Sequence, residues 1–128
     1  MSRGLADTSV FIAWESGRSI AEDRVPEELG VSVVTIAELR AGVLAAAHTG
    51  DRARRLDSLN SASFLDPLPI DQAVAEAWAD LRVALRDARR RMPVNDSWIA
   101  ATALAHGIPV VTQDDAYLDV PGLDVIRV

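Results

Sequence analysis

The stretch NDSWIAATALAHGIPVVTQDD, residues 95–115, decides the fold that we predict for this chain. Residues 95–106 are apolar nearly all round, which is typical of a buried helix, and Gly107 is a typical helix stop. The continuous apolar run 108–111 predicts a strand buried in a parallel sheet. Because the helix passes directly into the strand, the two should run antiparallel, so that the helix begins at the carboxyl end of the strand.

The rest of the chain alternates strands with helices. We expect further strands at 5–6, 31–34 and 125–128, and at best a short edge strand within 64–70. Thr35 to Glu38 has the spacing of a capping box, and Asp71 is a good N-cap. We expect further helices over about 10–16, 35–47, 51–63 and 71–90. This order predicts a three-layer α/β fold with a mostly parallel central sheet flanked by helices.

The length and composition of the chain exclude several classes of function. The 128 residues predict one domain, 1–128, and the formal charge of −6 argues against a generalist nucleic-acid binder, which is usually basic. The chain has no cysteine and no lysine, which excludes thiolate metal sites, cysteine nucleophiles and chemistry that requires lysine. The first seven residues do not resemble a signal peptide, and charges interrupt every apolar stretch. We therefore expect a cytoplasmic protein with no membrane partner.

Four acidic residues fall where parallel strands should end. Asp7 ends the first predicted strand, and Asp114 follows the strand of residues 108–112. Glu38 lies in the first turn of the helix after the second strand, and Asp96 lies in the first turn of the buried helix. All four positions should meet at the carboxyl edge of a parallel sheet, where open α/β sheets place ligand sites.

Carboxylates brought together in this way repel one another unless a cation lies among them. Without cysteine or a candidate histidine the ligands are oxygen atoms, which favours the hard ions Mg²⁺ or Mn²⁺. Ser9 and Thr112, each two residues from an acid, could add hydroxyl contacts, and Asp115 competes with Asp114 as the last ligand. Each acid taken singly could be an ordinary cap or turn residue, but four independent caps need not share one edge.

Four short motifs occur in order along nearly the whole chain. They are DTS at 7–9, TIAEL at 35–39 with Gly42, ND at 95–96 followed by IAA at 99–101, and VTQD at 111–114 with Tyr117. In order and spacing they resemble the PIN-domain ribonucleases, and more closely the VapC-type toxins of bacterial type II toxin-antitoxin pairs. The resemblance implies a PIN-like domain, Mg²⁺-dependent cleavage of RNA, and an acidic site on Asp7, Glu38, Asp96 and Asp114.

The same resemblance implies the partners and the reaction. The partners would be an RNA substrate (transfer, ribosomal or messenger RNA), a cognate protein antitoxin and a second copy of the chain. The products would carry 5′-phosphate and 3′-hydroxyl ends. We expect Asp7, Asp96 and Asp114 to hold one metal ion, with Glu38 completing the site or orienting the attacking water. Tyr117 stands where this family commonly has phenylalanine.

Three features outside the acids have two interpretations. Arg82, Arg86 and Arg90 recur at every fourth residue and could bind RNA phosphates, although a solvated helix face is the interpretation that we slightly favour. The three tryptophans are expected in the core rather than as platforms for RNA bases. One set of apolar residues could line a helical groove that receives an antitoxin, but ordinary packing in the core would require the same residues. They are Phe11, Ile12, Trp14, Leu39 and Val43.

Three other functions compete with an RNA nuclease. A phosphoacceptor receiver domain also collects aspartates at strand ends, but it needs a lysine that this chain lacks. A nuclease acting on DNA and a PIN-like binding module without catalysis both stay open. Paired RNA and DNA cleavage assays test the first of these, and a metal titration tests the second.

Overall fold

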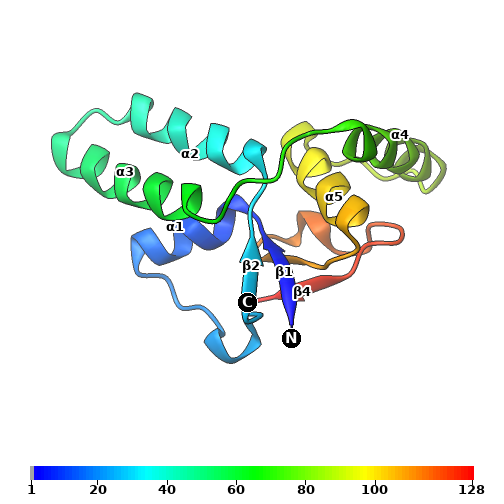
Figure 1. Ribbon diagram of the computed structural model, residues 1–128, viewed down its shortest axis with the longest axis horizontal. Coiled ribbons are helices and arrows are strands. Elements are labelled where there is room, and N and C mark those ends of the chain that lie inside the picture. The colour runs from blue at the N-terminus through cyan, green and yellow to red at the C-terminus, as the bar shows by residue number, and fades with distance from the viewer. Residues whose placement is uncertain (1) are drawn as a thin grey trace.

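Four parallel strands form the centre of the computed structural model. The structure describes residues 2–128, so Met1 of the predicted domain 1–128 lies outside the described residues. Every strand pairing is parallel. The strands lie in the order β2 (Glu28–Gly30), β1 (Arg3–Ala6), β3 (Val110–Thr112) and β4 (Val125–Arg127), as Figure 1 shows in part. The predicted α/β fold with a parallel central sheet is confirmed.

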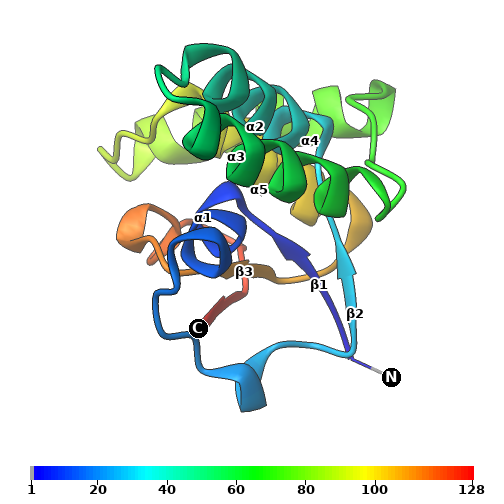
Figure 2. The same ribbon diagram turned by 90° about the vertical axis from the view of Figure 1, so that its left-hand side faces the viewer.

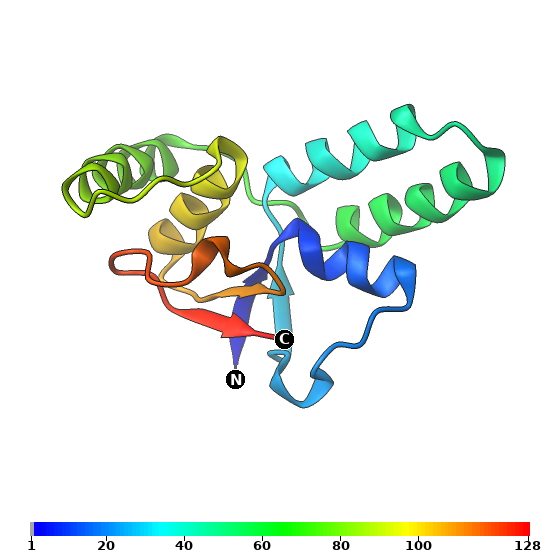
Figure 3. The ribbon, with the colours of Figure 1, turned by 180° about the vertical axis from the view of Figure 1, so that it is seen from behind.

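Helices cover both faces of this sheet. One group consists of α1 (Thr8–Ser16), α2 (Val33–Ala45) and α3 (Thr49–Ser63), and the other of α4 (Gln72–Asp87) and α5 (Val94–His106). The two groups lie on opposite sides of the strands, as the views from the front and from behind both show (Figures 1 and 3). Two single turns of 3₁₀ helix complete the chain, η1 (Glu22–Arg24) and η2 (Asp115–Tyr117). None of the helices within residues 2–128 is both long and apolar enough to cross a bilayer.

Alternate residues of the two central strands face opposite helix layers. Leu5 and Val110 pack in one apolar cluster with α4 and α5, whereas their neighbours Ala6 and Val111 pack in a second cluster with α1, α2 and α3. All four side chains are fully buried. Because successive side chains of a strand point to opposite faces, a sheet covered on both sides requires an uninterrupted apolar run.

The prediction of a strand at 31–34 is wrong. β2 ends at Gly30, and α2 begins at Val33. The hydroxyl of Ser32 caps this helix by accepting a 3.0 Å hydrogen bond from the backbone N–H of Val34, so Thr35 to Glu38 is not the capping box. The β-branched run favoured a strand, but the capping hydroxyl and the packing of the helix outweigh that propensity. The edge strand expected within 64–70 is a single parallel bridge between Leu68 and Ser32.

The caps and ends of α4 and α5 place Asp96 in the first turn of α5. Asp71 caps α4 as predicted, accepting a 2.9 Å bond from Val74 N, but the helix ends at Asp87 rather than near residue 90. Gly107, at φ 64°, ends α5 as predicted, since this backbone conformation favours glycine. α5 begins at Val94, so Asp96 lies inside its first turn and makes no capping bond there.

Candidate active site

The carboxyl ends of β1 and β3 lie side by side. Ala6 is in register with Val111, and the N–H of Asp7 donates a 3.0 Å hydrogen bond to the carbonyl of Val111. Asp7 therefore lies next to Thr112, and Asp114 follows two residues further on. Figure 2, in which α1 is seen nearly end-on, shows that this helix begins where β1 ends. The predicted meeting of strand ends is confirmed for this pair of strands.

Asp7 is a buried carboxylate, only 3% exposed. Ser9, in the first turn of α1, donates a 2.6 Å hydrogen bond to its Oδ1, and the Ser9 hydroxyl lies 3.3 Å from Oγ1 of Thr112. The pKa of Asp7 is raised to about 6, mainly by burial and to a smaller extent by Asp96 and Asp114, while the hydrogen bonds from Ser9 and Thr112 oppose the change. Ser9 and Thr112, predicted as auxiliary groups, thus orient the acid and favour its charged form.

Asp96 reaches the same edge from α5. The hydroxyl of Tyr117 in η2 donates a 3.2 Å hydrogen bond to Oδ1 of Asp96. Partial burial raises the pKa of Asp96, with smaller contributions from Asp114 and Glu38, while the Tyr117 bond lowers it. Tyr117 is itself fully buried, and burial raises its phenol pKa, so the hydroxyl stays a donor at neutral pH. Its bond to Asp96 is a contact that the sequence did not indicate.

Glu38 comes from α2 and is held by α1. The hydroxyl of Thr8 donates a 2.7 Å hydrogen bond to Oε1 of Glu38 and lies 3.1 Å from Oγ1 of Thr35. Thr8 follows Asp7 directly, so one turn of chain orients two of the four acids. Thr8 belongs to the DTS motif, but the sequence indicates no role for it, because nothing local to Thr8 shows that α2 lies opposite.

The structure separates Asp114 from Asp115. The backbone N–H of Asp114 donates a 2.8 Å bond to Oγ1 of Thr112, and its side chain accepts a 2.9 Å bond from Ala116 N at the start of η2. Asp115 forms an ion pair with Arg127 of β4. Asp114 raises the pKa values of Asp7 and Asp96. These contacts favour Asp114 as the fourth acid of the edge.

The four carboxylates line one edge of the sheet without a cation of their own. The ion pairs of residues 2–128 leave out Asp7, Glu38, Asp96 and Asp114. Asp96 and Asp114 raise the pKa of Asp7, and Asp114 and Glu38 raise the pKa of Asp96, so each acid lies within electrostatic range of at least one other. As the described side chains lie, no three acids or histidines are close enough to enclose an ion. The arrangement is thus an open row of acids rather than a closed ligand cage.

Two predictions about the other residues are partly wrong. Trp78 and Trp98 stack at 4.4 Å between ring centroids and are partly buried, as expected, but Trp14 is 41% exposed. In the predicted groove, Phe11 and Leu39 are buried in the core, whereas Ile12 is exposed. The α1 residues that point inward pack on the sheet, and only those on the outer side of the helix are left to form a surface.

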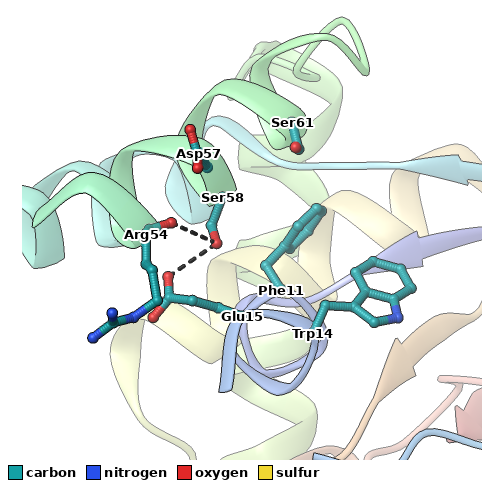
Figure 4. Close-up of a pocket in the computed structure, with 7 residues that line it drawn as sticks. All are labelled: Phe11, Trp14, Glu15, Arg54, Asp57, Ser58 and Ser61. Carbon is teal, nitrogen blue, oxygen red and sulfur yellow. Dashed lines mark hydrogen bonds between the residues drawn. The ribbon is translucent and has the colours of Figure 1, made fainter. Parts of the chain in front are cut away.

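A hollow of about 310 Å³ lies between α1 and α3, away from the acids (Figure 4). In Figure 4 Phe11 and Trp14 lie on one side of it and Ser58 on the other, where Ser58 Oγ donates a 2.9 Å hydrogen bond to Oε1 of Glu15. Its lining combines aromatic rings with hydroxyl and charged groups, and none of the four acids contributes to it. This hollow is a surface feature of the α1–α3 layer, separate from the candidate active site.

Residues 5–123 match the PIN domain family. The chain therefore belongs to the PIN domain family.

Within that family it groups with the VapC-type ribonucleases. It is 48% identical over 128 residues to "Ribonuclease VapC5" of Mycobacterium tuberculosis, covering 98% of this chain and 95% of that protein. It is 52% identical over 126 residues to "Ribonuclease VapC4" of the same organism, covering 98% and 97%. The crystal structure of VapBC-5, a toxin-antitoxin system of Mycobacterium tuberculosis, superimposes with a TM-score of 0.92 at 44% identity over the whole of both chains.

Proposed function

We propose that this protein is a metal-dependent endoribonuclease and the toxin of a toxin-antitoxin pair. The observation that carries the proposal is the buried carboxylate of Asp7, placed among three other acids at the carboxyl edge of the sheet with no cation paired to it. A purely structural role would favour a neutral side chain there, because burying an unpaired charge is costly. The similarity to proteins named as VapC ribonucleases supports the choice of RNA.

The donor set fits a hard divalent cation. The acids and the side chains that hydrogen-bond to them offer oxygen, from carboxylates and hydroxyls, and the unpaired negative charge needs a counter-ion. We assign Asp7, Asp96 and Asp114 as the residues that would hold Mg²⁺, or Mn²⁺ in its place, with Glu38 at the border of the site. When bound, such an ion supplies Lewis-acid stabilisation of charge on the phosphodiester and lowers the pKa of water.

The chain's own residues then have distinct roles. Thr8 orients Glu38, and Glu38 accepts a hydrogen bond from the attacking water, so that the water oxygen faces the phosphorus. The water loses a proton to solvent as the new P–O bond forms, and the departing 3′-oxygen takes up a proton as its bond to phosphorus breaks, which leaves a 5′-phosphate and a 3′-hydroxyl. Ser9 and Tyr117 fix the carboxylates of Asp7 and Asp96. These are positioning residues, because they act through the acids.

A cleavage assay tests this proposal. Purified protein is incubated with a 5′-labelled single-stranded RNA and MgCl₂, and in parallel with DNA of the same sequence. We expect cleavage of RNA, loss of cleavage in EDTA, recovery with MnCl₂, and no cleavage by the Asp7→Asn variant. Cleavage of DNA alone would instead identify a DNA nuclease. A protein that binds no Mg²⁺ or Mn²⁺ in calorimetry would be the catalytically silent module.

The toxin role needs a cognate antitoxin, and exposed apolar side chains on the helices α1, α2 and α3 support one. Trp14 and Leu56 are 41% and 43% exposed, and Leu44 is 70% exposed. The structural relative is a toxin-antitoxin assembly. We propose that the antitoxin covers this layer; co-purification with the product of a neighbouring gene, abolished by Trp14→Glu with Leu56→Glu, tests it. Self-association and a cytoplasmic location stay predictions, tested by light scattering of the free protein and by cell fractionation.

A further inference from the structure

The end of α4 and the segment after it form a second feature, which the row of acids does not use. A hollow of about 280 Å³ is lined there by Arg82, Leu85, Arg86, Arg90, Arg91 and Met92. Four of the chain's 13 arginines thus surround one hollow, in a protein whose net charge is −6. The residues described as lining it include no acid. The hollow lies at the end of α4, and α4 flanks α5 on its outer side (Figure 1).

The four guanidinium groups have different partners. Arg82 lies 5.2 Å from the centre of the Trp78 ring, and Trp78 stacks on Trp98, so the Arg82 side chain is supported by an aromatic pair. Arg86 contacts its neighbour Asp87 in an exposed pair, which is worth little in water. Arg91 is exposed and, within residues 2–128, forms no ion pair.

Arg90 connects the hollow to the active-site edge. Its Nη2 donates a 2.8 Å hydrogen bond to the carbonyl of Ala116. Ala116 lies in η2, between Asp114, which accepts its N–H, and Tyr117, which donates to Asp96. The Nε of Arg90 is buried and has no acceptor within the described chain. The arginine hollow is therefore fixed to the same turn that orients two of the acids.

We propose that this hollow binds a backbone phosphate of the RNA strand that is cut at the row of acids. The inference rests on the proposed function, and it assigns how that substrate is positioned. Arg82, Arg86 and Arg91 donate to the phosphate oxygens, since guanidinium groups match phosphate with paired hydrogen bonds. Arg90 holds η2 in place and adds positive charge. The acids bind a cation, but without it they repel the negatively charged RNA strand. A cationic site beside them therefore supplies RNA affinity that a protein of negative net charge otherwise lacks.

Binding measured without cleavage tests the proposal. A fluorescein-labelled single-stranded oligoribonucleotide is titrated with protein in EDTA at increasing NaCl. We expect Arg86→Ala with Arg91→Ala to bind about tenfold more weakly at low salt, and its log–log salt slope to be shallower by about 1.4, since each phosphate contact on a single strand contributes about 0.7. The matched control is Arg3→Ala with Arg24→Ala, which removes the same charge at the opposite end of the strands and should leave the affinity unchanged.

Each outcome has one meaning. Equal affinity and slope for the Arg86/Arg91 variant and the wild type would overturn the proposal, as would an equal loss in the control, which would show only the effect of net charge. If RNA binding is unchanged while the cognate antitoxin no longer co-purifies, the hollow is a protein interface and the proposal is wrong. Because binding is measured in EDTA, a protein that binds RNA here but never cleaves it contradicts the proposed function and not this site. Circular dichroism confirms that each variant is folded.

Discussion

The hydroxyl of Tyr117 donates a 3.2 Å hydrogen bond to Oδ1 of Asp96. The bond joins η2, which follows β3, to the first turn of α5, which precedes it, so it closes the chain around the active-site edge. Tyr117 is completely buried, and its hydroxyl has the one polar task of holding this acid. Orientation of the acids by neighbouring hydroxyl groups is the common principle of the site, since Ser9 and Thr8 do the same for Asp7 and Glu38.

Tyr117→Phe should therefore impair catalysis without unfolding the protein. The ring and its packing remain, but Asp96 loses a hydrogen bond that favours its charged form. We expect about a tenfold rise in the Mg²⁺ concentration needed for half-maximal cleavage, in the range typical of groups that orient metal ligands. The rate is measured over a metal titration beside Asp96→Asn, which should be inactive at every concentration. An unchanged Mg²⁺ dependence would show that the phenol only fills space.

Asp114→Asn and Asp115→Asn form a matched pair of adjacent substitutions. Asp114 is within electrostatic range of Asp7 and Asp96, whereas Asp115 pairs with Arg127 at the surface. We expect the first variant to lose RNA cleavage at least a hundredfold, an amount equivalent to about 3 kcal/mol of transition-state stabilisation. The second should keep nearly full activity, because an exposed ion pair contributes little. The reverse order of activities would identify Asp115 as the functional acid.

Asp7 should make the metal-free protein less stable as the pH rises. Its folded-state pKa of about 6 lies above the ordinary value of 3.8, so the native state binds the proton more tightly than the unfolded state does. The cost is absent below about pH 4 and grows through pH 6, to at most about 3 kcal/mol at neutral pH. Asp7→Asn should remove it and raise the free energy of unfolding in EDTA at pH 7.5.

Urea denaturation at pH 5 and pH 7.5 measures this effect, with Asp57→Asn on the exposed side of α3 as the control. The difference between wild type and Asp7→Asn should be larger at pH 7.5. Equal stability of the two proteins at both pH values would mean that the carboxylate is not destabilised by its burial. Added MgCl₂ should stabilise the wild type more than the variant.

Two glycine substitutions should have opposite effects on stability. A Cβ added at Gly4 would lie 2.6 Å from Cγ2 of Val111 and 3.0 Å from Cγ of Pro26, so Gly4→Ala should destabilise the protein by about 1 to 3 kcal/mol. At Gly42, inside α2, the nearest atom is Cδ of Arg55 at 3.9 Å. Gly42→Ala should stabilise by up to about 1 kcal/mol, because alanine favours a helix. The melting temperatures of both variants, compared with that of the wild type, measure these effects. A Gly4→Ala variant as stable as the wild type would show that β1 and β3 can separate without cost.

The sequence by itself determined the α/β class, the antiparallel run of α5 into β3, and the location of Asp7 and Asp114 at strand ends. These features depend on local signals: an apolar run covered on both faces, a glycine at positive φ, and the direction of a parallel strand. The start of α2 was misplaced because β-branched residues favour a strand locally, whereas the Ser32 cap and the packing of the helix decide the outcome.

Only the tertiary structure decided which groups hold the acids. Thr8 meets Glu38 across 30 positions of sequence, and Tyr117 meets Asp96 across 21. The tertiary structure also paired Asp115 with Arg127, exposed Trp14, and joined the arginine hollow to η2 through Arg90. The physical reason is that a pattern in one segment specifies its own backbone and its buried face, whereas a side-chain contact depends on how two segments are oriented in the packed core.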